Sequence, residues 1–72
     1  MSSIAKVIEV IAESEESFDD AVEAALREAS RTVEHIKSIW VENMTAVVED
    51  GRIARYRVDA KVTFLVRGHS LS

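Results

Sequence analysis

The strongest constraint on the fold is an almost unbroken alternation of apolar and mostly polar residues between residues 54 and 67. One row is apolar and consists of Ala54, Tyr56, Val58, Ala60, Val62, Phe64 and Val66. The other row is mostly charged or polar and consists of Arg55, Arg57, Asp59, Lys61, Thr63, Leu65 and Arg67. A period of two is typical of a half-buried β-strand, because successive side chains point to opposite faces of a sheet. The segment therefore predicts a long strand with one face on a core and one charged face.

The run before it, Ser38 to Val48, is rich in β-branched and aromatic residues and predicts a second strand. Between the two runs lies Glu49-Asp50-Gly51-Arg52, whose Asp-Gly pair accepts the positive φ angles of a tight hairpin turn. Strands of about 12 to 16 residues span roughly 40 to 50 Å, whereas a helix of about 20 residues covers only about 30 Å. We therefore expect the strand ends and the outer sheet face to contact other chains.

Upstream, the β-rich run from Ile4 to Ile11 predicts a first strand. Ser14, followed by two glutamates, predicts a helix start, since its hydroxyl can accept from free N–H groups. An amphipathic helix over roughly residues 15 to 34 is indicated by apolar positions three or four apart. These positions are Phe18, Val22, Ala25, Ala29, Thr32, Val33 and Ile36. The order predicts a single α+β (β-α-β-β) domain over residues 1–72, with a three-stranded antiparallel sheet wrapped around one helix.

The composition narrows the possible partners. A domain of 72 residues without Cys has no disulfides to stabilise it, and domains this small bury only about 60% of their unfolded surface, which favours self-association. The net charge of −4 argues against binding to nucleic acid. There is no long apolar run and no signal-peptide pattern, so no membrane partner is expected and the predicted location is the cytoplasm.

The search for chemistry yields few candidates. His35 is expected to face the last carbonyls of the helix and His69 lies in the tail, and neither has a second His at metal-ligand spacing. No nucleophile and base can be paired, so we predict no enzyme, no catalytic residue and no dedicated metal site. The acidic residues at the helix start are Glu13, Glu15, Glu16, Asp19 and Asp20. They are expected to interact with the helix dipole, and Ca²⁺ binding is the alternative.

Two side chains of the predicted hairpin suit binding. Trp40 is expected in one strand row with Ser38, Glu42, Met44, Ala46 and Val48. A subunit interface is favoured for Trp40 over stacking on a ligand. Arg57 lies on the outer face, where its guanidinium suits a carboxylate or a phosphate. The alternative for Arg57 is an ion pair between subunits with Glu42 or Asp59.

Three segments in this order resemble the dodecin family over about residues 4 to 67: Lys6-Val7-Ile8-Glu9-Val10, Ser14-Glu15-Glu16-Ser17-Phe18, and, after Gly51-Arg52, Tyr56 to Phe64. The resemblance implies a hollow homododecamer with cubic (23) symmetry, without enzymatic activity. In flavin-binding members, flavins such as riboflavin or FMN sit in pairs at two-fold contacts between trimers. A Trp near the start of the second strand stacks on the ring, and a Gln in the third strand hydrogen-bonds its polar edge. The implied role is flavin storage and photoprotection.

In this chain, Ser38 stands at the position of the stacking Trp and Arg57 at that of the Gln. Trp40 lies two residues further on, about 7 Å along the strand. The predicted flavin-site residues are therefore Ser38, Trp40 and Arg57. Some dodecins that lack the Trp and Gln pair have been linked to calcium. The alternatives are thus a shell that binds calcium or an anionic ligand, and a purely structural assembly.

Overall fold

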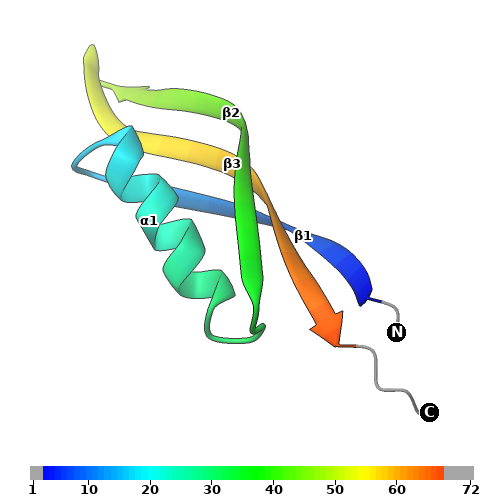
Figure 1. Ribbon diagram of the computed structural model, residues 1–72. Helices are drawn as coiled ribbons and strands as arrows, with labels where there is room; N and C mark the ends of the chain where they lie inside the picture. The colour runs from blue at the N-terminus through cyan, green and yellow to red at the C-terminus, as the bar shows by residue number, and fades with distance from the viewer. Residues whose placement is uncertain (1–2, 68–72) are drawn as a thin grey trace.

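The computed structural model describes residues 3–67 and contains one helix and three strands. They are β1 (Ser3–Ser14), α1 (Phe18–Ala29), β2 (Ile36–Glu49) and β3 (Arg52–Arg67), in that order. β3 lies in the centre of the sheet, and β1 and β2 pair with it antiparallel on either side. α1 covers one face of this sheet (Figure 1). The predicted β-α-β-β order and three-stranded antiparallel sheet are thus confirmed.

The hairpin between β2 and β3 closes as its sequence predicts. Glu49 pairs with Arg52, which leaves Asp50 and Gly51 as the two turn residues. Their φ angles are 53° and 73°, so both occupy the left-handed region. A two-residue turn of this kind matches the right-handed twist of the strands that it joins.

The core lies between α1 and the central strand. Its fully covered residues are small and come from two rows, Ala21, Ala25 and Ala29 on α1 and Val58, Ala60 and Val62 on β3. Small side chains on the helix allow its backbone to approach the sheet closely. At one end, the rings of Phe18 and Tyr56 meet edge to face with centroids 5.0 Å apart. The predicted apolar row of β3 is therefore core at its centre, whereas Val66 at its end is 36% exposed.

The start of α1 lies three residues later than predicted, so the expected boundary at residue 15 is wrong. Ser17 is the N-cap, and its Oγ accepts from the N–H of Asp20 at 2.9 Å. Ser14 ends β1 instead, and its Oγ accepts from the N–H of Glu16 at 2.8 Å and donates to Asp20 Oδ2 at 2.7 Å. Ser14 thus organises the turn before the helix, because a serine side chain can also bond to backbone two residues on.

The helix also ends earlier than the predicted residue 34. Ser30 Oγ donates to the Leu26 carbonyl at 2.8 Å, and the N–H of Val33 donates to the Ala29 carbonyl at 3.0 Å. The chain then turns at His35, whose φ is 61°, and the His35 carbonyl accepts from the N–H of Leu65 at 3.1 Å. His35 therefore lies in the connection to β2 and not against the helix end. His69 lies outside the described residues.

A bulge changes which face the second half of β2 presents. The register shifts between Val41 and Asn43, after which Met44 lies opposite the buried Val58. Before the bulge, Trp40 lies opposite Lys61 on the face away from α1, here called the outer face. The predicted single row is therefore wrong: Ser38 and Trp40 lie on the outer face, whereas Met44, Ala46 and Val48 lie on the helix side. An extra residue in one strand bends it and reverses the alternation, and β2 is visibly bent (Figure 1).

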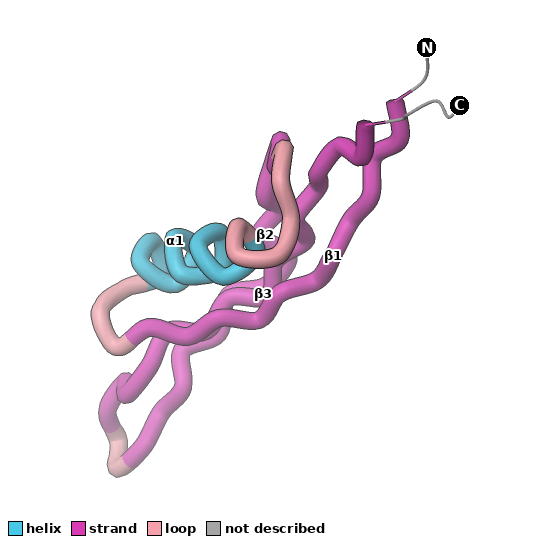
Figure 2. The backbone as a smooth tube through the Cα atoms, turned by 90° about the horizontal axis from the view of Figure 1, so that it is seen from below, coloured by secondary structure: helices cyan, strands magenta, loops and turns pink. Residues whose placement is uncertain are grey.

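The sheet is much longer than the helix that covers it. The fold measures 57 × 19 × 13 Å, whereas a helix of 12 residues is only about 18 Å long. Figure 2 shows the strands extending beyond α1 in both directions. The expectation that the strands exceed their helical cover is confirmed. Within residues 3–67 no helix has the length and apolar character that a membrane span needs.

Candidate functional site

Three carboxylates, one from each strand, converge near the middle of the outer face. Glu9 comes from β1, Glu42 from β2 and Asp59 from β3, and one carboxylate oxygen of each lies within 4.8 Å of those of the other two. We call them the carboxylate cluster. Asp59 is placed there because β3 is central, and Glu42 because it sits at the β2 bulge. Convergent carboxylate oxygens are the ligand set that a hard divalent cation takes.

The electrostatics of the carboxylate cluster are unfavourable in the absence of a counter-ion. The Oδ1 atom of Asp59 is buried and has no hydrogen-bond partner, which costs free energy for an acceptor removed from water. A hydrogen bond from the protonated Glu9 carboxyl to Asp59 raises the pKa of Glu9 above its ordinary value. Repulsion by Asp59 and by Glu42 raises it further, whereas Lys61 lowers it. The cluster therefore favours a bound positive charge.

Lys61 supplies one such charge from the neighbouring position on β3. Its Nζ lies 3.6 Å from Glu42 Oε1 and 5.9 Å from the centroid of the Trp40 ring. Trp40 is 64% exposed, so its indole ring is open to solvent beside the carboxylate cluster.

A second ionic group lies on the same face towards the β2–β3 turn. Glu13 accepts from Arg57 Nε at 2.7 Å and from Arg55 Nε at 3.0 Å, and Arg55 Nη1 also donates to Glu49 at 3.1 Å. The hydrogen bond from Arg57, aided by the charges of both arginines, lowers the pKa of Glu13. The hydrogen bond to Glu49 raises the pKa of Arg55. With two arginines and two glutamates, this group has no net charge. Within the chain, the carboxylate that pairs with Arg57 is that of Glu13, and not that of Glu42 or Asp59.

The three predicted flavin-site residues share the outer face but lie apart along it. Ser38 lies opposite Thr63, Trp40 opposite Lys61, and Arg57 opposite Thr45. At about 3.3 Å per residue, Arg57 is roughly 13 Å from the level of Trp40 and roughly 20 Å from that of Ser38. A single chain thus does not bring the three together around one ring.

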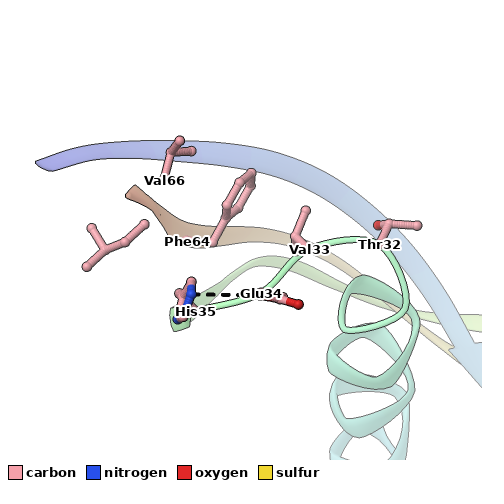
Figure 3. A pocket seen from close by; sticks show the side chains of 7 residues that line it. Thr32, Val33, Glu34, His35, Phe64 and Val66 are labelled. Atoms are coloured by element: carbon pink, nitrogen blue, oxygen red, sulfur yellow. Dashed lines mark ion pairs between the residues drawn. The ribbon is translucent and has the colours of Figure 1, made fainter. Parts of the chain in front are cut away.

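A pocket of about 450 Å³ lies on the helix side, where the sheet extends past the end of α1. Its lining residues are Thr32, Val33, Glu34, His35, Phe64, Leu65 and Val66. Figure 3 shows Phe64 and Val33 beside this space, with His35 paired to Glu34 at its edge. None of the predicted flavin-site residues lines this pocket.

Comparison with known proteins decides the family. The dodecin family model matches residues 4–67, which is nearly the whole chain. The chain belongs to the dodecin family. A curated dodecin from Thermus thermophilus is 28% identical over 64 residues, covering 89% of this chain and 93% of its own length.

Solved dodecin structures share the fold closely. The dodecin of Streptomyces coelicolor superposes with a TM-score of 0.87 at 28% identity, covering 93% of this chain and 96% of its own. A second structure is the calcium-chelating immunodominant antigen of Mycobacterium tuberculosis, calcium dodecin, which has a novel calcium-binding site. It superposes with a TM-score of 0.78 at 26% identity, covering 96% of this chain and 99% of its own.

Within this dodecin fold, two of the acidic residues at the helix start already have partners, and calcium binding there remains a prediction. Glu13 is bound to the two arginines, and Asp20 is bound to Ser14. The carboxylate cluster was missed, because its members are 17 to 50 residues apart in sequence. The outer row of β3 contains Asp59, and pairing β1 with β3 so that Glu9 lies opposite Lys61 would have placed Glu9 beside it.

Proposed function

We propose that this chain is the subunit of a homododecameric shell with 23 symmetry that binds and stores a small ligand and has no enzymatic activity. The observation that supports assembly is the imbalance between covered and exposed apolar residues in the single chain. Among residues 4–66, six small hydrophobic residues are buried, whereas large ones such as Ile11, Met44, Val48 and Ile53 are more than half exposed. Exposed apolar side chains that lie side by side, as Val48 and Ile53 do at paired positions, are typical of contacts between chains. The predictions of one domain over residues 1–72 and of a cytoplasmic location remain predictions.

Light scattering coupled to size exclusion tests the assembly. Twelve chains of 8.0 kDa give a particle of about 96 kDa. A stable monomer or dimer at micromolar concentration contradicts the proposal.

Flavin is the ligand that the family resemblance favours, and the proposed residues are Ser38, Trp40 and Arg57. Their common outer face and the exposure of Trp40 support a site shared between subunits, in which the residues come from different chains. Trp40 supplies the aromatic face and Arg57 a donor to the polar edge of the ring.

The test is a titration with riboflavin and with FMN, followed by flavin fluorescence. We expect quenching that saturates near one flavin per subunit and is lost in Trp40→Ala. Leu26→Ala, an exposed position on α1, is the control and should quench as the native chain does. Unchanged fluorescence with the native protein contradicts flavin binding.

Calcium is the second candidate ligand, with the carboxylate cluster as its site. The buried and unpaired Oδ1 of Asp59, beside two further carboxylates within 4.8 Å, supports it. A divalent cation neutralises the repulsion among these groups and gives Asp59 Oδ1 a partner.

Isothermal titration with CaCl₂ tests this candidate. Asp59→Asn and Glu9→Gln are expected to weaken binding at least tenfold, whereas Glu23→Gln, which removes an exposed charge from α1, should bind as the native chain does. Equal affinity in all four proteins contradicts the assignment of the cluster.

A further inference from the structure

Lys61 lies between the carboxylate cluster and the single Trp of the chain. Its ammonium group is 3.6 Å from Glu42 and 5.9 Å from the Trp40 ring centroid, and its side chain is 38% exposed. Carboxylates and the faces of indole rings both attract an ammonium group. One position of the ammonium group therefore serves both partners, and a small movement away from Glu42 leaves it with the ring alone.

No other positive charge among residues 4–66 pairs with the carboxylate cluster. Arg57, two residues from Asp59 on the same face, is bound to Glu13 at 2.6 Å. With all groups ionised, three carboxylates and Lys61 leave a net charge of −2. Lys61 thus compensates one carboxylate and leaves Asp59 Oδ1 without a partner.

We propose that Lys61 is the resident counter-ion of the carboxylate cluster, and that a divalent cation entering the cluster displaces it from Glu42 and leaves it on the Trp40 ring alone. The proposal rests on the second candidate function and adds to it the residue that sets the affinity. A divalent cation beside Glu42 repels an ammonium group at 3.6 Å. The Trp40 ring is the nearby partner that attracts the ammonium group without competing for the metal. Lys61 therefore lowers the affinity for the cation, and Trp40 reports its displacement.

The test is a titration with CaCl₂ of the full-length native protein, Lys61→Met and Lys6→Met, by calorimetry and by Trp fluorescence. We expect Lys61→Met to bind Ca²⁺ about tenfold more tightly, because a unit charge about 5 Å from a divalent cation is removed. The native fluorescence should change on binding, and that change should be absent in Lys61→Met. Lys6→Met is the matched control, since Lys6 lies on β1 opposite Phe64, on the other face from Glu9. Lys61→Gln repeats the test if the Met variant does not fold.

The outcomes separate this proposal from the calcium function. Equal affinities in the native protein and in Lys61→Met overturn the role of Lys61 and leave calcium binding intact. Binding in Lys61→Met alone supports the role of Lys61 and overturns calcium binding by the native chain. Absence of binding in all proteins overturns both.

Discussion

Two valine-to-alanine substitutions distinguish the core of one subunit from surface that is covered only on assembly. Val62 is fully buried between Ile8 and Ile39 on the neighbouring strands and faces α1. Val62→Ala removes two methyl groups, worth about 1.6 kcal/mol of transfer free energy. The cavity left behind brings the expected loss of unfolding free energy to about 2 to 3 kcal/mol. Val48 is 61% exposed in the single chain, so Val48→Ala should cost a free subunit less than about 1 kcal/mol.

In an assembled shell the two positions should behave more alike. If neighbouring subunits cover Val48, its truncation should cost about 1.5 kcal/mol. The assay is guanidinium unfolding followed by far-UV circular dichroism at one fixed subunit concentration, since assembly makes stability concentration-dependent. A cost for Val48→Ala below about 0.5 kcal/mol in a particle of full size would refute the argument that other subunits bury the strand ends. A cost below about 1 kcal/mol for Val62→Ala would refute the assignment of the core.

Three further predictions concern local features. Glu13→Gln should reduce the loss of stability in acid, because Arg57 lowers the pKa of Glu13 from 4.5. The ionised Glu13 carboxylate stabilises the fold above pH 4.5, and this stabilisation is lost as the pH falls through the lowered pKa. Thermal melts across pH 3 to 7 will measure the difference between the two proteins. Gly51→Ala should destabilise the hairpin by about 1 kcal/mol in urea unfolding, because φ is +73° although a Cβ there contacts nothing; an unchanged midpoint contradicts this. Ser17→Ala should lower the free energy of unfolding by about 1 kcal/mol through loss of the N-cap. If only Ser14→Ala lowers it, the assignment of Ser17 as the N-cap is contradicted.

The sequence was sufficient for the elements that depend on local pattern. The period of two in β3 and the Asp50-Gly51 turn predicted the hairpin, because both follow from backbone geometry. The predicted start of the helix was wrong because Ser14 and Ser17 can each bond to backbone N–H groups, and only the structure shows that Ser17 caps α1 through the N–H of Asp20 whereas Ser14 ends β1.

The candidate site was predictable only in part. Arg57 was identified as an outer-face residue by alternation, and the structure places it there. Trp40 was placed only in a strand row, and the pairing with Lys61 is what assigns it to the outer face. The bulge at Glu42 has no signature in the sequence, since it depends on how β2 registers with β3. Without that register, the meeting of Glu42 with Glu9 and Asp59 could not be foreseen.

The strand order also has a consequence for synthesis of the chain. Of the elements in residues 3–67, β3 is translated last, yet both β1 and β2 pair with it and not with each other. Until residues 52–67 have left the ribosome, neither earlier strand can form its ladder, and two β-rich segments remain unpaired. Unpaired strands are templates for aggregation. Nascent chains that stop before β3 should therefore be the species that chaperones capture, and those that reach Arg67 should escape them.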